Sequence, residues 1–167
     1  MSVPFTPMTF EIETKRLALR MWKESDAYWY RELVAERGVV KPTLENARKK
    51  ISLFRKGAQE NGISLLSIQR QNEGDFIGYC GLIIGRSSLE EPEIAYELFR
   101  SVHGHGYATE AASAIVNAAM ATGRHRLWST VRSWNVASFR VLEKIRFERR
   151  LRTWDEDGEL VWNVRDL

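Results

Sequence analysis

The sequence has one cysteine, and it lacks the features that would place the chain outside the cytoplasm. Cys80 stands alone, which excludes an internal disulfide and fits a reducing compartment. The N-terminus has no basic–apolar signal pattern, and no apolar run approaches the ~20 residues that a membrane span needs. We therefore expect a cytoplasmic protein that makes no membrane contact.

The chain also lacks the common phosphate-loop motifs and any cluster of basic residues. No G-x-x-x-x-G-K-[ST] occurs, which argues against a P-loop nucleotidase. Gly104-His105-Gly106 is missing the third glycine of a dinucleotide fingerprint. Lys+Arg 25 against Asp+Glu 22 gives 25 − 22 = +3, an excess too small and too dispersed to indicate a nucleic-acid partner. A basic lean suits an anionic cofactor, and ordinary solubility explains it equally well.

Length and composition predict one globular domain. The chain has 167 residues, 44% of them hydrophobic, which is enough to bury a sizeable core. Residues 1–10 carry Pro4 and Pro7 and little charge, so we predict a flexible N-terminal arm there. Residues 11–167 then form a single domain, in which we predict no metal site.

The most informative stretch reads as a strand, a glycine turn and a helix. Residues 93–100 alternate apolar and polar side chains with the period of two that marks a strand. Gly104 and Gly106 break the pattern and permit positive φ, and the alanine-rich segment 109–121 should be helical. The free amides at a helix start favour an anion, so this junction is suited to a phosphate or pyrophosphate. A plain tight turn is the alternative.

The remaining periodicity predicts further strands and helices on both sides of this stretch. Polar turns at 71–75 and 85–91 imply consecutive antiparallel hairpins, and the crossover helix 109–121 implies a parallel strand after it. We expect strands at 16–21, 63–70, 76–84, 93–100, 125–131, 148–154 and 160–164, and helices at 27–36, 43–56, 109–121 and 136–144.

Three stretches resemble the GNAT superfamily of N-acetyltransferases, and within it the Rim-type branch that acetylates ribosomal proteins. Residues 102–111 (VHGHGYATEA) are similar to its acetyl-coenzyme A loop, residues 13–20 (ETKRLALR) to its opening strand and residues 135–147 (NVASFRVLEKIRF) to its last helix. The resemblance implies an α/β (α+β) fold with about four helices. Its mixed, mostly antiparallel sheet has six to seven strands and is splayed between two central parallel strands.

The resemblance also implies where acetyl-coenzyme A binds. Backbone groups of Leu98, Phe99 and Arg100 would pair with the pantetheine arm, and the glycine loop would wrap the pyrophosphate. The family often has Arg or Gln three residues before the first glycine, where this chain has Ser101. The further cofactor-binding residues that we predict are His103, Gly104, His105, Gly106, Tyr107, Ala108, Thr109, Asn135, Ser138 and Arg140.

For catalysis, the resemblance implies direct attack of an amine on the thioester in a ternary complex. Many members carry a tyrosine seven residues after Asn135, as the acid for the leaving thiolate, but this chain has Leu142 there. We therefore predict Ser138 as the acid, with a serine bonded back to its own helix as the alternative. Glu93 and Glu97 share one face of their strand. We favour Glu93 as the base, against a structural pair with no chemical role.

The acceptor remains open at this stage. The resemblance implies that the first two helices shape its pocket, and the candidate lining residues are Trp22, Trp29 and Tyr30. Aromatic side chains at helical spacing are more often part of the core. The acceptor is then a protein N-terminus or a small-molecule amine. The alternative function is a non-catalytic acyl-coenzyme A-binding module. Homodimers are common in the branch, although no interface is identifiable here.

Overall fold

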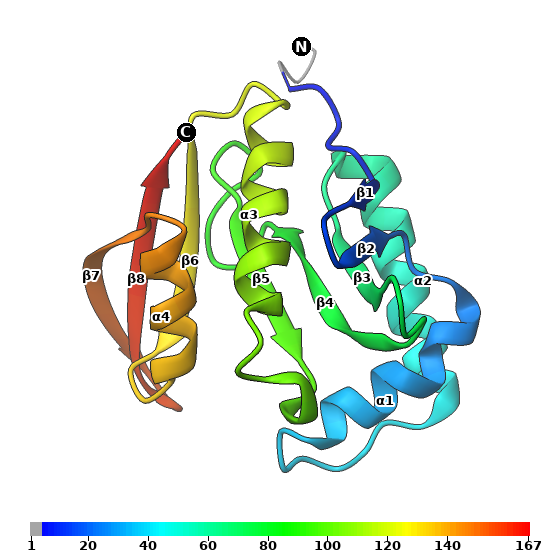
Figure 1. The fold of residues 1–167 in the computed structure, drawn as a ribbon. Coiled ribbons are helices and arrows are strands. Elements are labelled where there is room, and N and C mark those ends of the chain that lie inside the picture. The colour runs from blue at the N-terminus through cyan, green and yellow to red at the C-terminus, as the bar shows by residue number, and fades with distance from the viewer. Residues whose placement is uncertain (1–4) are drawn as a thin grey trace.

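A computed structural model describes residues 5–167, which form one mixed sheet with helices on both faces (Figure 1). The strand order is β1-β2-β3-β4-β5-β6-β8-β7, and every neighbouring pair is antiparallel except β5 and β6. The strands are β1 (Glu11–Glu13), β2 (Leu17–Arg20), β3 (Leu65–Arg70), β4 (Phe76–Ile83), β5 (Glu93–Leu98), β6 (Arg126–Arg132), β7 (Glu148–Asp155) and β8 (Gly158–Asp166). The helices are α1 (Ala27–Ala35), α2 (Leu44–Asn61), α3 (Tyr107–Met120) and α4 (Val136–Lys144), with short 3-10 turns η1 (Glu24–Asp26) and η2 (Arg100–Val102).

The predicted fold class is confirmed, with one strand more than expected. The additional strand is β1, which pairs with β2 through Glu11 opposite Arg20 at the edge of the sheet. A three-residue edge strand leaves too short an alternation to be seen in the sequence. None of the helices within residues 5–167 is both long enough and apolar enough to cross a membrane.

Two hydrophobic cores lie on opposite faces of the sheet. The larger one holds α3 and α4, which stand in front of the sheet in Figure 1. Ala111, Ala112 and Ala119 of α3 are fully buried in it, and their small side chains let the helix lie close to the strands. The second core joins α1 and α2 around Trp22, whose indole N–H donates to the carbonyl of Leu65 at 3.1 Å.

Residues 5–10, which we assigned to a flexible arm, are docked on the domain. The amide of Thr6 donates to the carbonyl of Thr122, and the amide of Met8 donates to the carbonyl of Gly62. The side chain of Met8 is 3% exposed. Burial of an apolar side chain and pairing of the backbone amides explain this placement. Residues 1–4 lie outside the described residues.

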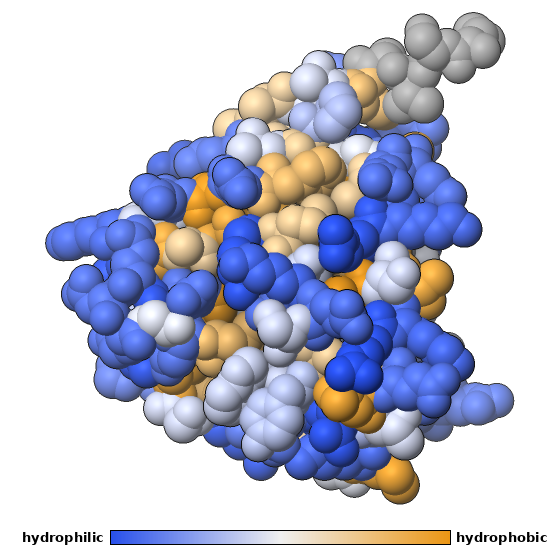
Figure 2. Space-filling view, turned by 90° about the vertical axis from the view of Figure 1, so that its right-hand side faces the viewer, coloured by the Kyte–Doolittle hydropathy of each residue, from blue (hydrophilic) through white to orange (hydrophobic). Residues whose placement is uncertain are grey.

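Figure 2 views this side of the molecule and shows an apolar strip between hydrophilic side chains.

Gly78 lies where β4 and β5 approach each other too closely for a side chain. A Cβ added to Gly78 of β4 would lie 2.1 Å from the carbonyl oxygen of Glu97, and the φ of Gly78 is +153°. We predict that Gly78→Ala lowers the free energy of unfolding by about 1–3 kcal/mol, as measured by urea denaturation. The matched control is Gly57→Ala in α2, where a Cβ meets no atom of residues 5–167 within 4 Å. It should raise stability by about 0.5–1 kcal/mol. Equal effects from both variants would contradict the prediction.

Candidate active site

The sheet stops pairing between its two parallel strands after a single register pair. Glu93 of β5 lies opposite Trp128 of β6, and the amide of Trp128 donates to the carbonyl of Pro92 at 3.0 Å. Beyond that point the strands diverge (Figure 1). The amide of Phe99 faces β4, because it donates to Ile77. By the alternation of strand geometry, the backbone groups of Tyr96 and Leu98 face the opening.

The side chain of Glu93 ends the hydrogen-bonded pairing between β5 and β6. Continued pairing would send the amide of Thr130 to the carbonyl of Ile94. The carboxylate of Glu93 accepts that amide instead, at 3.2 Å, together with the Thr130 hydroxyl at 2.5 Å. Its other oxygen accepts the amide of Arg86, and the residue is 3% exposed. These contacts count against Glu93 as the base, because a base needs an oxygen open to the amine.

Glu97, on the same face of β5, is the accessible carboxylate of the two. Its side chain is 25% exposed, and it accepts hydrogen bonds from Arg37 Nε at 2.9 Å and from the Tyr79 hydroxyl at 3.1 Å. Arg37 follows α1, so this contact links the helical cover to the strand. Burial, with a contribution from Glu97, raises the pKa of Tyr79 well above its ordinary value, so its hydroxyl stays protonated at neutral pH.

The glycine loop lies at the C-terminal end of β5. Gly104 and Gly106 have φ of +83° and +79°, in the left-handed region that glycine tolerates best. Gly106 caps α3, and the residues from His103 to Gly106 are exposed. The free amides at the start of α3, from Tyr107 onward, therefore open to solvent at a helix N-terminus, where an anion is favoured.

Glu110 fastens the start of α3 to the residues that immediately precede β2. Its carboxylate accepts from the amide of Arg16 at 2.9 Å, from Arg16 Nε at 2.7 Å and from the Thr14 hydroxyl at 2.5 Å. The guanidinium of Arg16 also donates to the carbonyl of His105 and lies 4.4 Å from the ring centre of Tyr107. Partial burial acts to raise the pKa of Glu110, but the bonds from Thr14 and Arg16 outweigh it and lower that pKa.

The start of α4 closes the other side of the opening. The Asn135 side chain caps this helix by accepting from the amide of Ser138 at 3.2 Å. The Tyr96 hydroxyl donates to the carbonyl of Ser138 at 3.0 Å, so β5 and α4 are joined across the divergent strands. Asn135 and Ser138 are both half-buried, whereas Arg140 is exposed on α4. The role of Tyr96 is not visible in the sequence, because its partner lies 42 positions away.

Two of the three residues predicted to contact a pantetheine arm have backbone amides that are already hydrogen-bonded within the domain. The amide of Phe99 is already bonded to Ile77, as described above. The amide of Arg100 donates to Glu36 Oε1 at 2.9 Å, and its guanidinium donates to the carbonyl of Glu36. Of the three predicted residues, Leu98 keeps its backbone on the side of the opening, where its carbonyl contacts the His103 ring at 3.0 Å.

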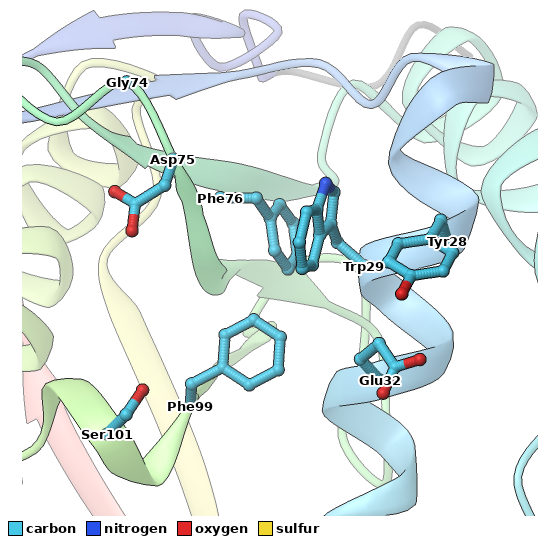
Figure 3. A pocket seen from close by; sticks show the side chains of 8 residues that line it. All are labelled: Tyr28, Trp29, Glu32, Gly74, Asp75, Phe76, Phe99 and Ser101. Carbon is cyan, nitrogen blue, oxygen red and sulfur yellow. The ribbon is translucent and has the colours of Figure 1, made fainter.

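Of the three aromatic residues predicted to line an acceptor pocket, two are buried in the second core and Trp29 borders a cavity. Trp22 is 1% exposed and Tyr30 is 7% exposed, and their rings contact each other edge-on in the second core. Trp29 lines a cavity of about 600 Å³ between α1, the β3–β4 turn and η2 (Figure 3). The helical spacing of these residues could not distinguish the buried side of α1 from its exposed side.

Comparison with known proteins gives one family. The sequence profile of the Acetyltransferase (GNAT) domain matches residues 16–148. The protein YkkB of Bacillus subtilis (strain 168), described as uncharacterized, is 30% identical over 99 residues. The aligned residues cover 57% of this chain and 58% of YkkB, so the chain spans a little over half the length of that relative.

Solved acetyltransferase structures share the fold over nearly the whole chain. An acetyltransferase from Agrobacterium tumefaciens str. C58 is 26% identical, with a TM-score of 0.79 over 99% of this chain and 95% of its own. RimL, the ribosomal L7/L12 α-N-protein acetyltransferase in complex with coenzyme A, is 18% identical, with a TM-score of 0.81 over 94% and 98%. The ribosomal-protein-S5-alanine acetyltransferase from Vibrio fischeri is 18% identical, with a TM-score of 0.77 over 93% and 96%.

The contacts of Glu93 predict a structural effect of its substitution. In Glu93→Gln an amide group would replace one carboxylate oxygen beside the donors of Arg86 and Thr130, leaving a buried donor unpaired. We expect the free energy of unfolding to fall by about 1–3 kcal/mol, measured by urea denaturation. The more accessible control Glu97→Gln should cost at most about 1 kcal/mol. A Glu93→Gln protein with wild-type stability and lost turnover would instead restore its role as a base.

The lowered pKa of Glu110 predicts how stability depends on pH. A carboxyl whose folded-state pKa lies below its unfolded value stabilises the fold at neutral pH, and this contribution is lost as the pH falls through the folded pKa. We therefore expect the wild type to lose more stability than Glu110→Gln between pH 7 and pH 3, as followed by urea midpoints. If the wild type and Glu110→Gln lose the same stability over this pH range, the contacts of Glu110 to Thr14 and Arg16 contribute nothing to it.

Proposed function

The chain belongs to the acetyltransferase (GNAT) family, and we propose that it transfers the acetyl group of acetyl-coenzyme A to a primary amine by direct attack in a ternary complex. One observation carries the proposal. Strands β5 and β6 diverge after a single pair beside a two-glycine loop at the start of α3. This arrangement places strand backbone groups that face the opening close to the free amides at the start of α3.

The residues at the opening and at the start of α3 fit the parts of acetyl-coenzyme A. The amides from His103 to Ala108, with Thr109 in the first turn of α3, would hold the pyrophosphate through hydrogen bonds and the helix dipole. The backbone of Leu98 and the Asn135 side chain would hold the pantetheine arm from the two sides of the opening. Arg140, exposed on α4, remains our candidate for the ribose phosphate.

The reaction needs a proton acceptor for the amine and a proton donor for the thiolate. The amine nitrogen bonds to the acetyl carbon, the carbon–sulfur bond breaks, and the sulfur takes the electron pair. We propose that Ser138 donates a proton to that sulfur, because the Tyr96 bond to its carbonyl holds the start of α4 in place. Glu97, more exposed than Glu93, is the better-placed carboxylate to take the amine proton, directly or through water.

The similarity in fold to RimL and to the Vibrio fischeri enzyme supports the Rim-type branch and a protein N-terminus as the acceptor. The second candidate is a non-catalytic module that binds acyl-coenzyme A. The observations that favour it are Leu142 in the position of the frequent tyrosine, and the full occupation of Glu93 by structural hydrogen bonds.

The proposed function is tested by thiol release from acetyl-coenzyme A with N-terminal peptides, amino acids, polyamines and aminoglycosides as acceptors. Turnover of one class identifies the acceptor. A rise in melting temperature with acetyl-coenzyme A, but no turnover of any amine, favours the binding module. If the protein shows no turnover and acetyl-coenzyme A causes no thermal shift, the assignment of the glycine loop is refuted.

Ser138 is tested within the active acceptor class. We predict that Ser138→Ala lowers kcat by about 10²-fold, with little change in melting temperature, because its hydroxyl acts on the leaving thiolate. The matched control Ser52→Ala removes an exposed helix serine on α2 and should leave kcat unchanged. Equal kcat in both variants would exclude Ser138 as the acid.

A further inference from the structure

The cavity beside α1 is separate from the opening between β5 and β6. Its lining comes from α1, from the β3–β4 turn and from the chain around η2, with no described lining residue from β6 or α4. Figure 3 shows Asp75 and Ser101 on one side, Tyr28 and Glu32 on the other, and aromatic rings between them. The lining residues are Tyr28, Trp29, Glu32, Gly74, Asp75, Phe76, Phe99 and Ser101.

Aromatic faces dominate this lining. Tyr28 and Trp29 are 50% and 47% exposed, and their rings meet edge-on with centroids 4.9 Å apart. Phe76 and Phe99 form a second edge-on pair at 6.0 Å across the cavity floor. Exposed aromatic rings have electron-rich faces, which attract organic cations.

The charged groups of the lining are both acidic. Glu32 and Asp75 contribute carboxylates, and none of the described lining residues is Lys, Arg or His. Each carboxylate has one cationic partner outside the lining. Lys41 contacts Glu32 through Oε1, and Arg70 holds the pKa of Asp75 below its usual range. Arg70 donates to both carboxylate oxygens of Asp75, at 2.8 and 2.6 Å, whereas Oε2 of Glu32 has no hydrogen-bond partner among the described residues, so Glu32 is the more available of the two.

We propose that this cavity binds a positively charged organic group, and that preferred acceptors therefore carry a cationic group in addition to the amine that is acetylated. Four aromatic rings and two carboxylates provide the complementary surface. Phe99 lines the cavity and is adjacent in sequence to Leu98, whose backbone faces the opening, so the proposal places the cation beside the acceptor amine. The second half of the proposal rests on acetyl transfer, whereas the binding itself does not.

Binding is tested with choline, which has no N–H to acetylate, and with its neutral isostere 3,3-dimethylbutan-1-ol, by calorimetry on the full chain without cofactor. We expect choline to bind about tenfold more tightly than the alcohol. Trp29→Ala and Glu32→Gln should each weaken choline binding several-fold. Trp154→Ala, an exposed tryptophan on β7, is the matched control and should bind choline as the wild type does.

A variant that is expected to bind choline more tightly makes this test more specific. Lys41→Ala removes the cation next to Glu32, so it should bind choline more tightly and leave the affinity for the neutral alcohol unchanged. Absence of choline binding, equal affinity for the two probes, or weaker choline binding by Lys41→Ala would overturn the proposal.

Kinetics test the link to the acceptor. With 1,5-diaminopentane and pentylamine as acceptors, the diamine should show the lower KM. Trp29→Ala should raise the KM of the diamine to that of pentylamine without changing kcat. A Trp29→Ala variant with the wild-type KM ratio would overturn the role of the cavity in acceptor choice. Absence of turnover with every amine would refute acetyl transfer, while choline binding would still establish the cavity as a cation site.

Discussion

The interruption of pairing between β5 and β6 is the constraint on which the site depends. A continuous sheet would bury the backbone groups of Tyr96 and Leu98 in hydrogen bonds with β6. The carboxylate of Glu93 prevents this by taking the amide that β6 would offer to Ile94. One buried side chain thus stops the ladder, and the strands beyond it separate. The glycine loop and α4 then stand on either side of the gap.

Long-range polar contacts hold the two sides of the gap in place. Glu110 fixes the start of α3 to the N-terminal end of β2 through Arg16, and Tyr96 fixes the start of α4 to β5. The end of α1 is joined to β5 and η2 through Glu36 and Arg37. Because each contact joins segments far apart in the chain, the site forms only when the whole domain has folded.

The distance along the chain between contacting residues explains which features the sequence could predict. The strand, glycine loop and helix from 93 to 120 follow from period, glycine conformation and alanine content, all of which are local. The cap by Asn135 is local as well. The role of Glu93 depended on Thr130, 37 positions away. The burial of Trp22 and Tyr30 depended on α2 and β3. Local spacing contains no information about either, so the sequence alone could not show that Glu93 is occupied by structural hydrogen bonds or that Trp22 and Tyr30 are buried.

The docked segment of residues 5–10 has a consequence for how the molecule can be presented to its surroundings. Its hydrogen bonds to Gly62 and Thr122 fix the beginning of the described chain at one pole of the molecule, and the C-terminal residue lies near the same pole (Figure 1). The glycine loop and α1, which lines the cavity, lie toward the opposite pole (Figure 1). A protein held on a surface through residue 167 would therefore direct the glycine loop and α1 away from that surface, toward the solution.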